Sequence, residues 1–554
     1  FSQEDIEACV RVVAGLGKNL NLFKLPALKP LRAALHPLIE EQMKNYDTKT
    51  VAGDKAKGKN RKKRKHDSVD VEYDLMKEQR RKLEALEDEY INQTQLRALR
   101  TKQLEALNAD GYAPRVPDGV AICAGSSSVP LLLEGGGQEP AAAGKEPKKV
   151  LNPISCYICH KPYVELHFFY HQLCPDCASF NFEKRNEMAD LRGKVCVVTG
   201  ARCKIGYRSA LKLLRCGAAV IATTRFPADA AQRYAAEEDS ADWSSRLHVY
   251  GLDFRDIALL EKFCVFVMDN YDRLDVIINN ACQTIRRPPA YYAHLLDAEN
   301  DYQRRLEGGS AGPVAGTDPS SHDGKMDEIA PKEGQMVNSA EEVSSIGHFL
   351  SSSDMTQLQM APGDEAGQGG AFPTGVLDVN RQQVDLRKKN SWTMKLHEVS
   401  TPELAEVFAI NAMAPAILDA RLKPLMERNM KDFKFIVNVS AMEGKFYRFK
   451  SDNHPHTNMA KAALNMMTRT SAQDYVKSNI FMTAVDTGWI NDEKPAELAV
   501  AHEKKHKFQT PLDEIDAAAR VLDPVIGPMK AIQNGEVVEP PWGLFLKDFM
   551  KCEW

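Results

Sequence analysis

The chain has 554 residues, of which 43% are hydrophobic and 27% are charged, which is enough apolar material for at least one large core. Lys and Arg number 72 against 76 Asp and Glu, and the net charge of −4 excludes a uniformly basic nucleic-acid-binding protein. No run of about 18 apolar residues occurs, so we expect no membrane span. The 12 cysteines do not resemble a disulfide framework, which predicts a reducing, intracellular compartment, either the nucleus or the cytoplasm.

The first part of the chain alternates helical and charged segments. Residues 1–48 carry apolar side chains at helical spacing and predict a small helical region. The basic linker 49–70 includes eight positive charges in the eleven residues 55–65, which indicates a nuclear-import or nucleic-acid patch or, alternatively, a flexible linker. Residues 71–108 contain no Gly or Pro and carry stripes of apolar residues at helical spacing. This pattern predicts a long amphipathic helix, which would act as a coiled-coil arm or pack on its own chain.

Two segments have the composition of disordered chain. Residues 109–150 contain Gly, Ala and Ser triplets with scattered Pro, which is typical of a linker. Residues 304–385 are rich in Gly, Ser, Asp and Glu. We interpret this second segment as an insertion into a larger domain, because strand and helix patterns resume after it. The insertion would enter at the rim of a cleft, as a lid, a docking tail or a solvated loop.

Two Cys-x-x-Cys pairs, Cys156 with Cys159 and Cys174 with Cys177, are separated by fourteen residues. Each pair can place two thiolates on one side of a metal ion, and two pairs complete a tetrahedral zinc site. We therefore expect a zinc-ribbon-like module over residues 151–182, with a structural role. The alternative is four unrelated reduced cysteines. Three neighbouring histidines are spare candidate ligands: His160, His167 and His171.

From residue 190 onward, short apolar runs alternate with helical patterns. We expect strands over 194–200, 217–225, 247–252 and 274–281, and a helix after the first strand. This alternation predicts an α/β fold with a doubly wound parallel sheet of Rossmann type. A glycine-containing turn over 199–206 would place a pyrophosphate at a helix N-terminus, where free N–H groups favour anions.

These motifs resemble the short-chain dehydrogenase/reductase family over residues 190–303 and 386–554. The resemblance rests on the turn 199–206, the run 279–282, the segments 408–412 and 435–440, and the run 461–464. It implies a site that binds a nicotinamide dinucleotide. The cofactor-binding positions implied or inferred are Gly200, Arg202, Lys204, Ile205, Gly206, Arg225, Asp253, Asn279, Ala281 and Lys461.

The same resemblance implies catalytic roles for three residues. Ser440 would polarise a carbonyl, Lys461 would hold the ribose, and Asn411 would fix an ordered water. The family tyrosine, four residues before the lysine, is replaced by Thr457. An aliphatic hydroxyl is a poor acid, since it lacks the tunable pKa of a phenol. Candidate replacement proton donors lie in the same segment: Tyr447, His454 and His456.

Two further departures concern the cofactor wall. Lys204 stands where the family has a glycine, so its side chain must point away or meet phosphate. Cys282 also replaces a glycine. At the end of the second strand, Arg225 stands where an acid would bind a ribose 2′-hydroxyl, which favours NADP over NAD.

The leading hypothesis is therefore a divergent NADP(H)-dependent oxidoreductase acting on a small carbonyl or alcohol substrate. Its rival is a catalytically impaired dinucleotide sensor or scaffold, which Thr457 favours. The helical arm and the zinc module are candidate surfaces for a protein partner, and a weaker candidate partner is nucleic acid. A homo-oligomer formed with a second copy of the chain stays an open alternative.

Overall fold

A computed structural model describes residues 67–101, 148–307, 351–361, 382–446, 450–490 and 509–554, with isolated residues between some of these ranges. Several predictions concern residues that lie wholly or largely outside this description. They are the helical region 1–48, most of the basic linker 49–70, the end of the predicted long helix (102–108), most of the linker 109–150, most of the insertion 304–385, and the candidate donor Tyr447. The chain divides into two compact units, Phe1–Lys82 and Leu83–Trp554. The second unit contains every site discussed below.

The centre of the second unit is an eight-stranded sheet in which all neighbouring strands pair in parallel except the last hairpin. This sheet confirms the predicted Rossmann-type fold. In spatial order the strands are β10 (Met550–Cys552), β9 (Phe545–Lys547), β8 (Ile480–Asp486), β7 (Lys434–Ser440), β6 (Val276–Asn279), β3 (Val195–Thr199), β4 (Ala219–Thr224) and β5 (Leu247–Gly251).

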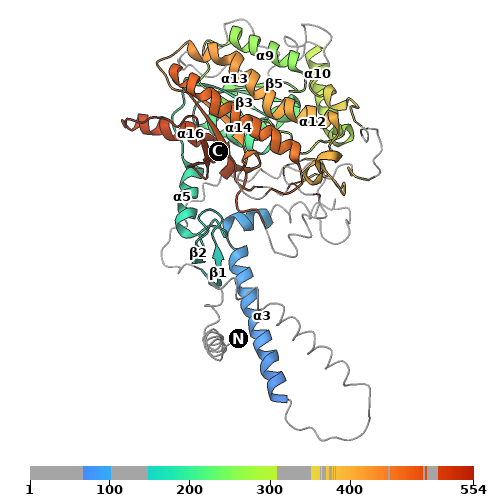
Figure 1. Cartoon of the computed structure of the whole chain (residues 1–554), viewed down its shortest axis with the longest axis vertical. Helices are drawn as coiled ribbons and strands as arrows, with labels where there is room; N and C mark the ends of the chain where they lie inside the picture. The colour runs from blue at the N-terminus through green and yellow to red at the C-terminus, as the bar shows by residue number, and fades with distance from the viewer. Residues whose placement is uncertain are drawn as a thin grey trace, which may run out of the picture. The chain divides into compact units, whose positions relative to one another are not determined.

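Helices cover both faces of the sheet (Figure 1). The domain therefore has three layers, with the sheet between two layers of helices. Alternate side chains of β3 enter the two cores on either side of the sheet. Cys196 and Val198 lie in the first core, and Val195 and Val197 lie in the second core. The first core contains α6 (Lys204–Arg215) and α16 (Glu514–Gln533), and the second contains α9 (Ile257–Asn270), α13 (Ala414–Glu427) and α14 (Pro455–Tyr475).

Shorter elements complete the domain. The remaining helices are α7 (Pro227–Ala235), α8 (Ser240–Trp243), α10 (Ala293–Glu307) and α12 (Thr401–Phe408). A π-helical turn, η8 (Ala409–Met413), joins α12 to α13. The short 3-10 turns are η3 (Ser244–Arg246), η4 (Pro289–Tyr292), η5 (Asp354–Gln357), η6 (Ser391–Thr393), η7 (Leu396–Glu398), η9 (Met442–Gly444) and η10 (Val476–Ser478).

The long helix predicted over 71–108 is interrupted at residues 93–94 in its described part. Helix α3 covers Asp67–Asn92, and a second helical segment occupies residues 95–101. The Thr94 hydroxyl donates to the Ile91 carbonyl at 2.7 Å. The N–H groups of Gln95 and Leu96 then donate to carbonyls of the cysteine module rather than to the preceding turn. Tertiary hydrogen bonds therefore end α3, and the amphipathic pattern alone did not indicate this break.

The cysteine module consists of β1 (Lys149–Ser155), β2 (Pro162–Glu165) and α5 (Pro175–Asn186). Strands β1 and β2 pair antiparallel, and Tyr170 and Leu173, both 0% exposed, lie in the apolar cluster below them. That cluster also contains Leu512, from the segment before α16. The module therefore shares its core with the Rossmann domain.

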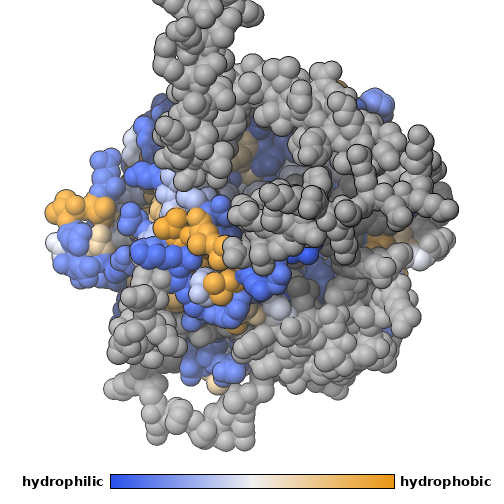
Figure 2. All heavy atoms as spheres, turned by 90° about the horizontal axis from the view of Figure 1, so that it is seen from below, coloured by the Kyte–Doolittle hydropathy of each residue, from blue (hydrophilic) through white to orange (hydrophobic). Residues whose placement is uncertain are grey.

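No described helix combines the length and apolar character required to cross a bilayer. In Figure 2 the coloured surface is mostly hydrophilic, with hydrophobic residues in small separate groups. This face, as far as its residues are described, has only small apolar groups.

Candidate functional site

The turn between β3 and α6 passes very close to the end of β6. Gly200 has a φ of +65°, and a Cβ there would lie 2.9 Å from the Ala281 Cα. A Cβ on Gly206 would lie 2.3 Å from the Gly200 carbonyl oxygen and 2.4 Å from the Asn280 Nδ2. Side chains at either glycine would separate these segments, so both glycines are required for the close approach.

A pocket opens at this turn, at the carboxyl ends of β3, β4 and β6, where open α/β sheets bind ligands. Eight of the predicted cofactor positions line it: Gly200, Arg202, Lys204, Ile205, Gly206, Arg225, Asp253 and Ala281. Additional lining residues were not predicted as ligand contacts, among them Thr224, Phe226, Phe254, Gln283 and Ile410. The sequence signal for three of these is adjacency, since Thr224 and Phe226 flank Arg225 and Phe254 follows Asp253.

Three cationic side chains line the pocket. The guanidinium groups of Arg202 and Arg225 lie 5.4 and 5.8 Å from the centre of the Phe226 ring. Arg225 also donates to the Tyr292 hydroxyl at 3.0 Å and stacks over that ring. Lys204 begins α6 with a φ of +54°, the left-handed conformation that glycine favours. Burial lowers the pKa of Lys204, but the carboxylates of Glu493 and Asp378 outweigh it and raise this pKa above its ordinary value.

Asp253 lies in the pocket wall with its carboxylate already paired. It is 0% exposed and accepts hydrogen bonds from the Arg255 backbone N–H, Nε and Nη2 at 2.7 to 3.1 Å. Burial raises the pKa of Asp253, but the Arg255 hydrogen bonds and nearby guanidinium charges lower it overall. Asp253 therefore stays ionised.

Described parts of the insertion 304–385 pack on the pocket rim. The Ser352 hydroxyl donates to the Arg225 carbonyl at 2.9 Å, and the Gln382 side-chain oxygen accepts from Arg202 at 2.5 Å. Next to them, the Met355 carbonyl accepts from Arg255 at 2.7 Å. These contacts place the insertion beside the cationic end of the pocket, and composition alone did not predict them.

The structure does not bring Asn279 to the pocket lining. Asn279 is 2% exposed, and its amide donates to Asp419 at 2.7 Å and to Asn438 at 2.8 Å. Asn438 in turn donates to the Thr468 hydroxyl at 3.0 Å. Because Asn279 is the last residue of β6, its side chain enters the core, whereas Asn280 and Ala281 reach the cavity.

The four predicted catalytic residues are buried at the end of β7, in η8 and in the first two turns of α14. The Ser440 hydroxyl donates to Asn465 at 2.6 Å, and the Lys461 ammonium donates to the Val439 carbonyl at 2.7 Å. Thr457 lies one turn before Lys461, is 2% exposed, and its hydroxyl has no hydrogen-bond partner among the described residues. Ser440 and Lys461 are therefore engaged within the protein, and neither lines the pocket as described.

Asn411 supports the pocket wall from the π-helical turn. Its side-chain oxygen accepts from the Gln283 N–H at 2.7 Å, and its Nδ2 donates to the Gln283 carbonyl at 3.0 Å. Gln283 and Ile410 line the pocket. π-Helical turns inside helices occur frequently at functional sites, and here the turn orients an amide toward the pocket wall.

The two candidate histidines have different surroundings. His454 has a φ of +41° and stacks on Trp392 with ring centres 4.0 Å apart, and burial lowers its pKa. His456 is 0% exposed, and its Nε2 lies 3.6 Å from a Glu403 carboxylate oxygen. Burial raises the pKa of Glu403, but its contacts with His456 and Ser391 lower it overall. His456 therefore has the Glu403 carboxylate beside it, whereas the charge of Glu443 does not overcome the effect of burial on the pKa of His454.

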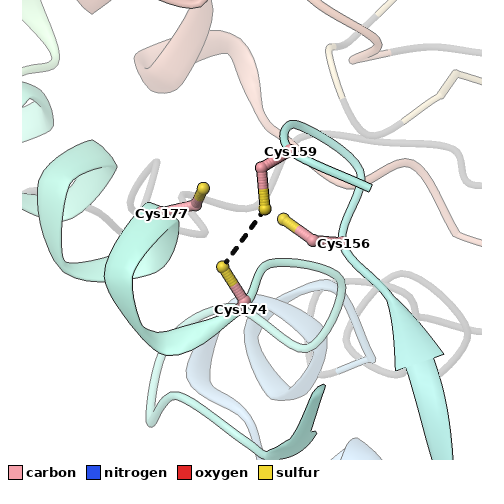
Figure 3. A group of neighbouring side chains, drawn as sticks. All are labelled: Cys156, Cys159, Cys174 and Cys177. Atoms are coloured by element: carbon pink, nitrogen blue, oxygen red, sulfur yellow. Dashed lines mark hydrogen bonds between the residues drawn. The ribbon is translucent and has the colours of Figure 1, made fainter. Parts of the chain in front are cut away.

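The four predicted zinc ligands converge in the cysteine module. The sulfur atoms of Cys156, Cys159, Cys174 and Cys177 all lie within 4.8 Å of one another, and all four cysteines are free thiols (Figure 3). The Cys159 and Cys174 sulfurs are 3.6 Å apart. Four thiol sulfurs at this separation match the donor set of a tetrahedral zinc site. Within the described ranges, this is the one group of at least three metal-binding side chains.

Two family models match the chain. The model described as short chain dehydrogenase matches residues 194–306, and the model described as Enoyl-(Acyl carrier protein) reductase matches residues 375–521. The sheet and its pocket define a Rossmann-type domain. This domain is a short-chain dehydrogenase/reductase family domain, and that family binds NAD(P).

Individual relatives cover different shares of the chain. The uncharacterized protein R665 of Acanthamoeba polyphaga mimivirus is 28% identical over 381 residues, which are 67% of this chain and 71% of the viral protein. Human retinol dehydrogenase 13 is 33% identical over 95 residues, 17% of this chain and 28% of its own length. A metagenomic short-chain oxidoreductase solved in complex with NADP has a TM-score of 0.35 at 16% identity, covering 65% of this chain and 99% of its own.

The buried Asp419 gives a pH-dependent prediction. Burial raises the pKa of Asp419 to about 7. An unfolded Asp has a pKa of about 3.9, so the folded state binds the proton more tightly and unfolding free energy falls as pH rises from about 4 to 7. We expect Asp419→Asn, which is neutral throughout, to exceed the wild type in stability at pH 8 by on the order of 2 kcal/mol, and by less toward pH 4. Urea unfolding at several pH values measures this.

The exposed Asp474 provides the matched control. It pairs with Lys423 at the surface, which lowers its pKa, so Asp474→Asn should not gain stability as pH rises. A stability difference for Asp419→Asn that is the same at pH 4 and pH 8 would contradict the assignment.

Proposed function

We propose that the chain is an NADP(H)-dependent oxidoreductase that transfers hydride between the nicotinamide and a carbonyl or alcohol substrate. The pocket carries this proposal, because an anion-binding turn at the start of α6 lies beside Arg202 and Arg225. The turn 200–206 would hold the pyrophosphate, and the two guanidinium groups would hold a 2′-phosphate through charge-assisted hydrogen bonds. When bound, the nicotinamide supplies or accepts the hydride.

The chain's own residues would then position the reactants and handle the proton. Lys461 places a cation one helical turn from Thr457, and Asn411 holds the pocket wall at Gln283. The partner-free hydroxyl of Thr457 can hydrogen-bond a substrate oxygen or a water molecule that carries the proton. His456, beside Glu403, is the alternative donor.

A second candidate function is dinucleotide binding without turnover, as a sensor or scaffold. It is favoured by Thr457, which lacks an acidic phenol, and by the internal hydrogen bond of Ser440 to Asn465. Under this alternative the pocket binds the cofactor with the same preference, and substrate reduction is absent.

We also propose that the four cysteines bind one structural zinc ion. All four positions of a tetrahedral shell would be filled by protein, which leaves none for a substrate. The Lys161 backbone N–H lowers the pKa of Cys159 to about 7, whereas burial raises the pKa of Cys174 and of Cys177, so metal binding has to release protons from these two thiols.

Cofactor preference is tested at Arg225. Arg225→Leu removes a charged partner of the 2′-phosphate, so we expect the Kd for NADPH to rise about 10- to 100-fold, and the Kd for NADH to change less than about threefold. Fluorescence titration of both cofactors measures this.

Arg421→Leu is the control, because Arg421 pairs with Glu261 on the surface and does not line the pocket. Tighter binding of NADH than NADPH by the wild type, or equal losses for both cofactors in Arg225→Leu, would contradict the NADP assignment.

Hydride transfer is tested at Thr457. We expect wild-type protein to consume NADPH with at least one member of a carbonyl panel, and Thr457→Val to lower kcat about 100-fold or more, because the substitution removes the hydroxyl at near-constant volume. Thr457→Tyr should raise turnover if the cleft positions the reactants as the family does. Absorbance of NADPH measures the rates.

The outcomes separate the candidate donors. Loss of activity in His456→Asn with Thr457→Val unchanged would transfer the role to His456. Cofactor binding without turnover in the wild type and in Thr457→Tyr would support the sensor function instead.

Zinc binding is tested at Cys174. We expect about one zinc per chain in reduced, natively purified protein, and loss of that zinc with a lower unfolding temperature in Cys174→Ser. Elemental analysis by mass spectrometry measures the metal. Cys282→Ser, which changes an exposed cysteine outside the cluster, is the control and should keep its zinc. Wild-type protein without zinc would end the proposal.

A further inference from the structure

The cysteine module contacts the chain where it leaves the sheet. After β8 ends at Asp486, the N–H of Trp489 donates to the Tyr157 hydroxyl at 3.0 Å. Tyr157 lies between Cys156 and Cys159, inside the first Cys-x-x-Cys turn. A residue that binds the Rossmann domain is thus placed by two of the four thiols of the cluster.

The module also holds the chain where it returns toward α16. The Arg100 guanidinium, on the segment packed against the module, donates to the Thr510 carbonyl at 2.6 Å and to the Leu512 carbonyl at 2.7 Å. The Gln172 amide donates to the Gln509 carbonyl. These contacts are to backbone carbonyls, so they fix the path of the chain rather than one side chain.

The chain just after β8 and the chain just before α16, which the module contacts, also contact each other. A Cβ on Gly488 would lie 2.6 Å from the Leu512 Cδ1, and Leu512 is 0% exposed in the core of the cysteine module. The segment that leaves the sheet after β8 and the segment that returns before α16 therefore meet on the cysteine module. They do so next to the carboxyl end of β8, the edge of the sheet where α/β domains bind ligands.

Buried ion pairs attach the same module to the start of α16. Arg185 of α5 pairs with Asp513 at 2.6 Å and with Asp516 at 2.9 Å, and Arg185 is 9% exposed. The Tyr170 hydroxyl donates to Asp516 at 2.5 Å. Removing one partner of a buried pair leaves an uncompensated charge, so this attachment is costly to open.

We propose that the cysteine module is a metal-dependent clamp on the connection between β8 and α16, with Tyr157 as its positioning residue. The metal holds the Cys156–Cys159 turn, the turn holds Tyr157, and Tyr157 holds Trp489 just after the carboxyl end of β8. This inference rests on the zinc site proposed above. It assigns the zinc a role in holding the chain that leaves this edge of the sheet, beyond stabilising its own module.

The clamp is tested by amide hydrogen exchange on the full chain. Tyr157→Phe removes the acceptor for the Trp489 N–H and leaves every cysteine in place. We expect exchange in peptides covering 487–490 to accelerate at least about fivefold, while zinc content and exchange at 509–513 stay as in the wild type. Tyr163→Phe is the control, because its hydroxyl donates to the His171 carbonyl inside the module. It should leave exchange at 487–490 unchanged.

Metal removal completes the test. Chelation of zinc from the wild type should accelerate exchange at both 487–490 and 509–513, and in Tyr157→Phe it should add an effect mainly at 509–513. Unchanged exchange at 487–490 in zinc-loaded Tyr157→Phe, or after chelation of the wild type, would overturn the clamp. Wild-type protein that contains no zinc would instead refute the zinc site, and NADPH titration reports separately on the dinucleotide pocket.

Discussion

The site of this protein depends on a close approach between backbone segments. The turn after β3 and the end of β6 meet at a distance that excludes a Cβ on Gly200 or Gly206. Their contact turns the start of α6 toward the cavity, so that free N–H groups and Lys204 face the space where an anion binds. The cationic side chains at the pocket rim, the insertion and Asn411 all lie around this contact between the turn after β3 and the end of β6.

The two arginines at the pocket rim have different partners. Arg202 is held by Asp229 of α7 and by Gln382 of the insertion, whereas Arg225 stacks on Tyr292. Among the described residues, no carboxylate hydrogen-bonds to the Arg225 guanidinium, which leaves it able to bind an anion. The insertion thereby acts as part of the domain at this rim, because its polar groups satisfy the cations around the cavity.

The chemistry of the site differs from the implied family pattern in its proton donors. Ser440 and Lys461 have the expected residue types, yet each makes a short hydrogen bond within the protein. Among the described residues, the Thr457 hydroxyl is one of several buried polar atoms here that have no hydrogen-bond partner, together with both ring nitrogens of His456. It costs free energy unless a ligand or water satisfies it. A hydroxyl in that state is consistent with a site that binds an oxygen atom, whether or not it transfers a proton.

The sequence by itself determined the parallel Rossmann sheet, the dinucleotide turn 199–206 and the four-cysteine cluster, because periodicity, glycine positions and Cys-x-x-Cys spacing are local properties. It also placed Arg225 at the pocket. Only the tertiary structure decided that Asn279 belongs to a buried network, that α3 ends at Asn92, and that the insertion reaches Arg202. The hydrogen bond between Tyr157 and Trp489, which are 332 positions apart in sequence, was also visible only in the tertiary structure. These outcomes depend on which hydrogen-bonding groups meet after long loops close, and local pattern carries no record of such partners.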